Sequence, residues 1–421
     1  VTNLANLLNC RVQTLISDLA KLGFKDISND YILTKEYTEL ILQEYNYHIP
    51  ETVIQDSQNI YDELKQSSNP KALKRRPPIV AILGHVDHGK TTIIDYLRNS
   101  SVVKQEHGGI TQHIGAFQVT TPVTKQKITF LDTPGHAAFL KMRERGANIT
   151  DIIVLVISME DSIKPQTVEA IKHIKNSGNE LIVAITKIDK FLRLEDRKKK
   201  LTKIINDLMQ HGIMVEDSGG DIQLVQISAK TGENMENLEE SIVSLSEIMD
   251  IRSENLSSTM VQGWIVESKI KNKVGNIATV LIKKGTLKKG DILLCGNTYC
   301  RVKSMTNNNN KPVTQALPAE AVEVLGWKDL PNVGDEIIQV KNEAVAKKYI
   351  NKRIALLELE NKVKSVEQYN QNRAIELHNT VLIGQDKLEV NELDKENNIN
   401  SGPKEVNFII KTDVSGSAEA V

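Results

Sequence analysis

Cysteine, long apolar runs and net charge are all scarce in this 421-residue sequence, and each scarcity excludes a class of protein. The chain has 3 cysteines, none in a C-x-x-C pair, which excludes a disulfide framework and indicates free thiols in a reducing compartment: Cys10, Cys295 and Cys300. No run of about 18 apolar residues predicts a membrane-spanning helix, and no cleavable signal pattern is visible. The formal net charge of -1 indicates no bulk basic field, so contacts with RNA would have to come from local patches.

The overall composition is that of a multi-domain protein. With 40% hydrophobic and 25% charged residues, a chain of this length is expected to form about two to four domains. Aromatic residues make up only 4%, while Asn, Ile and Lys are abundant, a bias typical of AT-rich coding sequences. This bias predicts the cytoplasm of a bacterium or the stroma of a plastid (chloroplast), without choosing between them. Because the chain begins with Val, we expect that an upstream segment is missing.

Two segments precede the first apolar strand. Residues 1–54 are predicted to form a small helical module, because Leu and Val recur at helical spacings in "VTNLANLLNCRVQTLISDLAKLGF". Residues 55–77 are polar and are predicted to be a linker. The linker ends in a basic cluster that is consistent with a solvated tether or with a contact to RNA: Lys71, Lys74, Arg75 and Arg76.

The rest of the chain falls into segments with different sequence patterns. Residues 78–250 alternate amphipathic stretches with apolar runs such as "IVAIL" and "DIIVLVIS", which predicts an α/β domain with a mostly parallel sheet and helices on both faces. Residues 251–344 are rich in short β-like pieces and turns, and predict an antiparallel β-barrel. Residues 345–403 are interpreted as a helix and connector. Residues 404–421 are interpreted as the start of a truncated α/β domain, expected to be loosely docked because a lone strand leaves its edge unpaired.

The segment "GHVDHGKT" fits G-x-x-x-x-G-K-[ST] between a buried strand and a helix, the context that a phosphate-binding loop requires. Glycines let backbone N–H groups surround the phosphates, and the helix N-terminus adds a favourable dipole. In such a loop Lys90 reaches the β- and γ-phosphates and the Thr91 hydroxyl ligates Mg²⁺. The predicted nucleotide-binding residues here are Gly84, His85, Val86, Asp87, His88, Gly89, Lys90, Thr91 and Thr92.

Three further motifs at strand ends indicate whether the predicted nucleotide is ATP or GTP. Asp132 follows a buried strand, where its carboxylate can hold the Mg²⁺ shell while the Gly135 N–H meets the γ-phosphate. In "TKID", Asp189 can accept hydrogen bonds from the guanine N1–H and N2 amine, which adenine does not offer. Taken alone, Asp189 is consistent with a helix N-cap and Ser228 with a turn, but the ordered set favours GTP. The motifs add Asp132, Thr133, Pro134, Gly135, Thr186, Lys187, Asp189, Ser228, Ala229 and Lys230.

Several of these motifs resemble those of known GTPases. "GHVDHGKTT", "DTPGH" and "SAKTG" resemble the translational GTPases. "EHGGITQHIGAF", "MRERGANITDIIVLVIS", "PQTVEAI" and "GTLKKGDILL" resemble the bacterial-type translation initiation factor 2 family, and this resemblance spans essentially the whole chain. The similarity to elongation factors is confined to the nucleotide motifs and the barrel. An elongation or selenocysteine-specific factor is one alternative, and a non-hydrolysing GTP-binding scaffold is another.

The resemblance implies roles for further residues. The switch would consist of Gly109, Ile110, Thr111, Gln112 and His113, with Thr111 contacting Mg²⁺ beside Thr91 and Asp132. His136 would be the catalytic residue that orients the attacking water; a capping or core role is the alternative. Asp87 is equally consistent with a ligand of a monovalent cation and with a solvent-facing loop residue.

One position departs from the family pattern. Thr186 stands where the family usually has Asn, whose amide braces the phosphate loop and the base. The Thr hydroxyl can still bond a backbone group, so the guanine preference through Asp189 is retained. Nucleotide affinity is nevertheless expected to be weaker.

As a whole, the resemblance implies a monomeric, ribosome-stimulated GTPase that uses GTP, GDP and Mg²⁺ and does not act at a membrane. In the family, the factor promotes binding of initiator formylmethionyl-tRNA to the small ribosomal subunit and protects that tRNA. It then hydrolyses GTP as the ribosomal subunits join. The family's tRNA-binding domains, which follow the barrel, are expected to be absent from this chain.

Overall fold

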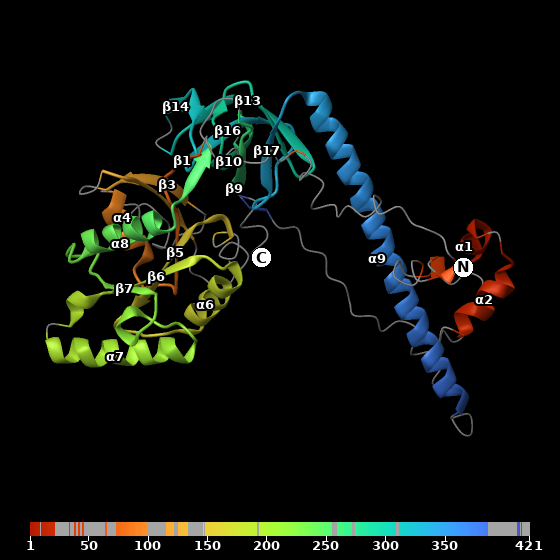
Figure 1. Ribbon diagram of the computed structural model, residues 1–421, viewed down its shortest axis with the longest axis horizontal. Coiled ribbons are helices and arrows are strands. Elements are labelled where there is room, and N and C mark those ends of the chain that lie inside the picture. Colours follow the sequence, from red (N-terminus) through yellow and green to blue (C-terminus); the bar gives the residue numbers. More distant parts are fainter. Residues whose placement is uncertain are drawn as a thin grey trace. The chain divides into compact units, whose positions relative to one another are not determined.

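The computed structural model describes residues 1–8, 10–21, 33, 38, 41–42, 44–45, 64, 73–98, 115–121, 125–133, 146, 148–191, 193–254, 259–271, 274–308, 311–385, 411–412 and 414 (Figure 1). The chain divides into two compact units. One comprises Val1–Asp62 and Asn351–Phe408, and the other comprises Glu63–Ile350 and Ile409–Val421. The second unit contains the sheet and the barrel.

The first unit contains a small helical core. Helix α1 covers Thr2–Leu7 and helix α2 covers Val12–Lys21. Their apolar side chains pack with others from the following segment, and four residues of this cluster are fully or almost fully buried: Ala5, Leu15, Leu19 and Ile41. The 43-residue helix α9, Glu343–Gln385, begins in the second unit after the barrel and continues into the first.

A six-stranded sheet forms the centre of the second unit. Its strand order is β3-β4-β2-β5-β6-β7, and all pairs are parallel except β3 with β4. The strands cover Gly115–Thr120 (β3), Lys127–Asp132 (β4), Ile79–Gly84 (β2), Ile152–Ser158 (β5), Glu180–Thr186 (β6) and Gln223–Gln226 (β7). Every residue of β2 and β5 is buried, as expected for strands covered on both faces. The predicted mostly parallel α/β fold is therefore confirmed.

Helices cover both faces of this sheet (Figure 1). On one face, α4 (Lys90–Arg98) and α8 (Met235–Ile248) share a core with alternate strand residues such as Val80 and Val154. On the other face, α6 (Pro165–Ser177) and α7 (Leu194–Gln210) pack against the intervening residues, such as Ala81 and Ile153. Two short 3-10 helices, Ile188–Lys190 (η6) and Glu216–Ser218 (η7), complete this domain.

A closed antiparallel barrel follows the sheet domain, as predicted. Strands β12, β17, β9, β10, β16 and β13 form a ring, which the pairing of β12 with β13 closes. These strands cover Ile292–Cys295, Glu336–Val340, Gln262–Lys271, Gly275–Lys284, Ala321–Trp327 and Thr298–Thr306. Short strands flank the ring: β14 (Pro312–Val313) pairs with β13, and β11 (Leu287–Lys288) pairs with β15 (Gln315–Ala316).

Two strands lie where the sequence predicted none. Strand β3 belongs to the stretch after the predicted switch. It lies at the edge of the sheet, where it pairs antiparallel with β4. Strand β1, Leu73–Arg75, lies within the predicted linker and pairs with β8, Arg252–Glu254. The next residue, Arg76, forms a buried two-pronged ion pair with Asp151 at 2.6 and 2.7 Å. The end of the predicted linker is thus part of the folded unit.

The sheet domain and the barrel share a small buried cluster. It includes Ile79 and Leu131 from the sheet with Val266 and Leu281 from the barrel. The Thr129 hydroxyl donates a 2.5 Å hydrogen bond to the Ala319 carbonyl across the same contact. The predicted strand and turn in 404–421 lie outside the described residues, except for Lys411, Thr412 and a β-bridge between Lys269 and Val414.

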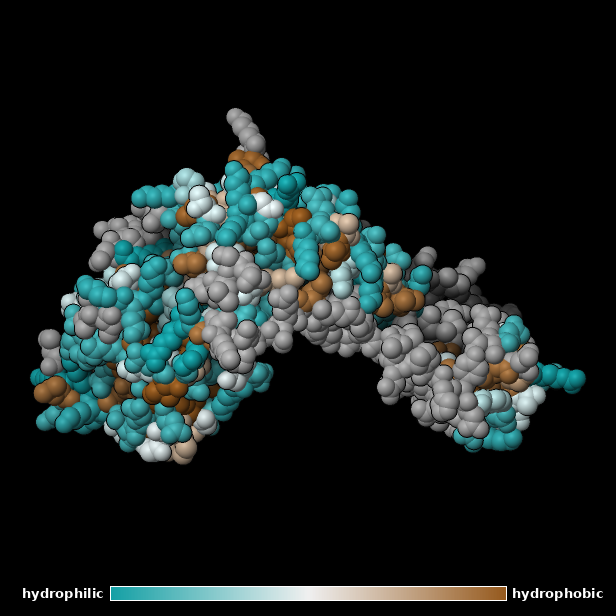
Figure 2. Space-filling model, turned by 45° about the horizontal axis from the view of Figure 1, so that its top comes forward, coloured by the Kyte–Doolittle hydropathy of each residue, from teal (hydrophilic) through white to brown (hydrophobic). Residues whose placement is uncertain are grey.

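The described surface is mainly polar. Figure 2 shows hydrophilic side chains over most of the visible face, with apolar ones in small groups. Within the part of the chain that the structure describes, no helix is both long and apolar enough to span a membrane.

Candidate nucleotide-binding site

The strand register brings the described parts of the sequence motifs to one edge of the sheet. Gly84 at the end of β2 pairs with Val156 of β5, and Ile82 of β2 pairs with Asp132 at the end of β4. Thr186, at the end of β6, pairs with Ser158 of β5. Because these strands are parallel, their carboxyl ends lie side by side, and residues separated by about a hundred positions meet there.

The phosphate loop has the backbone that glycine permits. Gly84 has φ of 155°, and a Cβ added there would lie 2.4 Å from the Val156 carbonyl oxygen. Gly89 has φ of 89°, after which helix α4 begins at Lys90. The Lys90 ammonium donates to the carbonyls of Gly84 at 2.7 Å and His85 at 3.0 Å. The lysine therefore lies across the loop that would surround a phosphate.

His88 anchors this loop to the sheet. Its side chain is fully buried, and its Nδ1 lies 3.2 Å from the Val156 carbonyl oxygen. That geometry assigns the proton to Nδ1, because a carbonyl can only accept. Burial lowers the pKa of His88 from 6.5 to about 4, outweighing the bond to Val156. His88 is thus a neutral structural residue, whereas Asp87 beside it is exposed with φ of 62°.

The described residues predicted to ligate Mg²⁺ offer oxygen atoms. Asp132 is buried at the end of β4, and Thr91 lies in the first turn of α4. Thr133 is fully buried, and its hydroxyl donates to the Ile82 carbonyl at 2.8 Å, which fixes the start of the loop after β4. Mg²⁺ prefers one or two protein oxygens together with phosphates and waters, so a hydroxyl and a carboxylate fit this ion. Among the described residues, no group of 3 or more His, Cys, Asp and Glu side chains is placed to hold a metal ion.

The base side of the site is held together by hydroxyl groups. Thr186 donates from Oγ1 to the His88 carbonyl at 2.6 Å, so the residue at the Asn position does brace the phosphate loop. Ser228 donates to Asp189 Oδ1 at 2.8 Å, which joins the two motifs predicted to bind guanine. Lys187 adopts a left-handed conformation with φ of 60°. Ala229 is half-buried, and Lys230 and Thr92 are exposed.

Some predicted site residues lie outside the described part of the chain. These are the switch residues 109–113, including the proposed metal ligand Thr111, together with Pro134, Gly135 and His136. One contact was not predicted: the Val86 N–H donates to Gln166 Oε1 of α6 at 3.4 Å. Gln166 belongs to the "PQTVEAI" stretch, but only the tertiary structure places it beside the phosphate loop.

Comparisons with known proteins agree with this geometry. Residues 75–248 match the family described as elongation factor Tu GTP binding domain, and residues 260–340 match elongation factor G domain 2. Residues 1–48 match the N-terminal region of translation initiation factor IF-2. Over the whole chain, the sequence is 62% identical to the mitochondrial IF-2 of Saccharomyces cerevisiae and 39% identical to the IF-2 of Caulobacter.

The chain belongs to the translation initiation factor 2 family. It spans 62% of the yeast relative's length and 37% of the Caulobacter relative's. Among solved structures, GDP-bound aIF5B from Aeropyrum pernix is similar with a TM-score of 0.56 and 26% identity, over 68% of this chain and 57% of that one. A bacterial selenocysteine-specific elongation factor has a TM-score of 0.51 and 26% identity, over 63% and 45% of the two chains.

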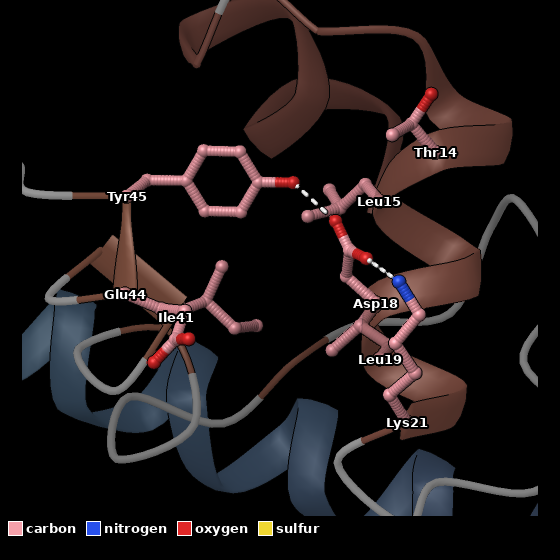
Figure 3. Close-up of a pocket in the computed structure, with 8 residues that line it drawn as sticks. All are labelled: Thr14, Leu15, Asp18, Leu19, Lys21, Ile41, Glu44 and Tyr45. Carbon is pink, nitrogen blue, oxygen red and sulfur yellow. Dashed lines mark hydrogen bonds and ion pairs between the residues drawn. The ribbon is translucent and has the colours of Figure 1, made fainter.

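The IF-2 N-terminal region contains a separate hollow of about 510 Å³. Figure 3 shows Tyr45 and Asp18 pointing toward one another across it, joined by a 2.7 Å hydrogen bond from the phenol. Lys21 donates to the same carboxylate at 2.9 Å. The bond to Asp18 raises the pKa of Tyr45 to about 12, and the bonds from Lys21 and Tyr45 lower that of Asp18. These polar groups satisfy one another, and none belongs to the nucleotide motifs.

Proposed function

We propose that this chain binds GTP and GDP with Mg²⁺ and hydrolyses GTP as part of a translation initiation factor. The observation that carries the proposal is the hydrogen bond between Ser228 and Asp189, at the same sheet edge as the phosphate loop. It presents a carboxylate with one oxygen anchored, suited to accept from the guanine N1–H and N2 amine. The family membership and the match of residues 75–248 support the same reading.

The residues divide into three tasks. The backbone N–H groups from Gly84 to Thr91 and the Lys90 ammonium, which lies on the carbonyls of Gly84 and His85, would hold the phosphates. Thr91 and Asp132, with Thr111 from the switch, would hold Mg²⁺, which when bound neutralises charge on the phosphates. Thr186, Lys187, Asp189 and the backbone of Ser228, Ala229 and Lys230 would hold the base.

The attacking water would be oriented by His136, which follows Pro134 and Gly135 in the sequence. We propose the boundaries 78–250 for this GTPase domain and 251–344 for the barrel. Gly109 to His113 would act as the switch that responds to the γ-phosphate. Asp87, exposed in the loop, is available for a monovalent cation.

The family supports a proposal for the partners and the location. The similarity to proteins named IF-2 supports the ribosome and initiator formylmethionyl-tRNA as partners of an initiation factor that contains this chain. We propose in addition that the chain is monomeric and does not act at a membrane. The 62% identity to a mitochondrial protein favours mitochondria over the plastid or bacterium predicted from composition. Cell fractionation of the full-length gene product with organelle markers tests this location.

The decisive experiment exchanges the base-recognition carboxylate. Asp189→Asn should weaken GDP binding and shift the preference toward xanthosine diphosphate, because an amide can donate to the xanthine oxygen. Asp217→Asn, at an exposed aspartate of η7, is the matched control and should leave GDP binding unchanged. Competition with a fluorescent GDP measures both. Equal binding of ATP and GTP by the unmodified chain would overturn the proposal.

Hydrolysis is tested separately. His136→Ala should retain GTP affinity while ribosome-stimulated turnover falls by roughly a hundredfold, the usual contribution of one positioned catalytic group. A parallel loss of binding would instead assign His136 a structural role.

A further inference from the structure

Two loops supply the side chains of the proposed guanine pocket. One is 187–191, after β6, and the other is 228–233, after β7. The direct link between them is the 2.8 Å hydrogen bond from Ser228 to Asp189. A single hydroxyl links the loops at one point only, so a second link matters for where the Asp189 carboxylate points.

Arg197, on α7, contacts both loops. Its Nε donates to the Phe191 carbonyl at 2.5 Å, and its Nη1 donates to Glu233 Oε1 at 3.3 Å. The side chain is only 22% exposed, compared with 43% for Glu233. Because the guanidinium is planar, its donors hold a fixed angle, and one rigid group spans the two loops.

These contacts close a ring. The Ser228 N–H donates to the Glu233 carbonyl at 3.0 Å, so Glu233 is tied to the residue that bonds Asp189. The ring runs from Asp189 through Ser228, Glu233 and Arg197 to Phe191, two residues from its start. Phe191 also packs against the core beneath α7, which anchors the ring to the domain. Both loops are therefore fixed relative to each other and to the sheet.

We propose that Arg197 is a positioning residue that sets the spacing of the two guanine-binding loops and thereby the preference for guanine. The inference rests on the proposed GTP-binding function. Arg197 would act on the nucleotide indirectly, through Asp189 and Ser228. No sequence motif marks it, because it lies on α7, outside the nucleotide motifs.

The test compares Arg197→Met, which keeps the aliphatic stem, with the unmodified chain. We expect the dissociation constant of GDP to rise about three- to tenfold, the usual effect of removing one or two part-exposed hydrogen bonds. Affinity for inosine diphosphate, which lacks the N2 amine, should fall less, because it makes only one bond to Asp189. The ratio of GDP to inosine diphosphate affinity should therefore decrease. A purely structural role would lower both affinities equally.

Two further variants complete the test: one removes the other end of the bridge, and one is a control. Glu233→Ala removes the other end of the bridge and should change the affinity ratio in the same direction, even if Arg197→Met fails to fold. Arg193→Met removes an exposed neighbouring arginine and should have no effect. An unchanged ratio in both Arg197→Met and Glu233→Ala would overturn the inference while leaving GTP binding intact. Absence of GDP binding in the unmodified chain would instead overturn the proposed function.

Discussion

The sheet domain and the barrel each contain an apolar core, yet the predicted site residues gather in the first. In the parallel sheet, successive strands end at the same edge, so Gly84, Asp132 and Thr186 come together although the chain between them is long. In the antiparallel ring, successive strands end at opposite sides, and its buried side chains fill the interior. The comparison teaches that a parallel topology gathers loops at one edge of the sheet, whereas an antiparallel ring divides them between its two ends.

The largest effect is expected from a methyl group added at Gly84. Gly84→Ala would place Cβ 2.4 Å from the Val156 carbonyl oxygen, so strands β2 and β5 must separate. We expect a loss of about 3 kcal/mol or more in the free energy of unfolding, together with loss of GDP binding. In the barrel, Gly290→Ala meets no atom within 4 Å. Only its φ of 95° is unfavourable there, and we expect roughly 1 kcal/mol. Urea unfolding measures both, and equal losses would remove the contrast.

The second prediction concerns the buried imidazole of the phosphate loop. The pKa of His88 is about 4 when folded and 6.5 ordinarily, so the unfolded chain takes up its proton first as the pH falls. The free energy of unfolding that depends on a neutral His88 is fully present above pH 6.5. It is lost as the pH falls toward 4, by up to about 3 kcal/mol. His88→Asn keeps a donor for the Val156 carbonyl but does not titrate. The pH dependence of urea unfolding should therefore be weaker in this variant; identical profiles would contradict a neutral His88.

The third prediction tests the hydroxyl that replaces the family's Asn. Thr186→Val removes the donor to the His88 carbonyl, and GDP affinity should fall roughly five- to tenfold, the effect of about 1 to 1.5 kcal/mol. Thr186→Ser should restore it. Because the hydrogen bond from Thr186 to His88 already braces the loop, we expect Thr186→Asn to increase the affinity for GDP by less than tenfold. Thr298→Val removes a barrel hydroxyl that bonds Asp329 and serves as the control, with unchanged affinity. A Thr186→Val variant that binds GDP normally would show that the brace is dispensable.

The smallest effect is a difference in thiol reactivity. Cys295 and Cys300 are fully buried in the barrel, and burial raises the pKa of Cys300 to about 12. Cys10 is partly exposed in the N-terminal region. A thiol reagent at pH 8 should therefore label Cys10 promptly and the barrel cysteines only after urea is added. Prompt labelling of all 3 thiols would show that the barrel interior opens easily.

Local patterns in the sequence predicted much of the fold and the candidate site. Unbroken apolar runs predicted the parallel strands, because residues buried on both faces leave no polar alternation. The same criterion missed β3, an edge strand that is only partly buried, and β1, whose residues are mostly exposed. Strands of this kind are defined by their pairing, since β3 pairs with the next strand, β4, and β1 pairs with β8, which is remote in the chain.

The sequence by itself determined the phosphate loop, the order of the nucleotide motifs and the family. Glycine, lysine and threonine at fixed spacing require only one strand, one turn and one helix. Only the tertiary structure decided how the motifs support one another. Thr186 bonds His88 across 98 positions, Ser228 bonds Asp189, and Arg197 spans two loops. Such contacts depend on strand register and on the packing of α7, and no local pattern records them because the partners share neither a helix turn nor a strand.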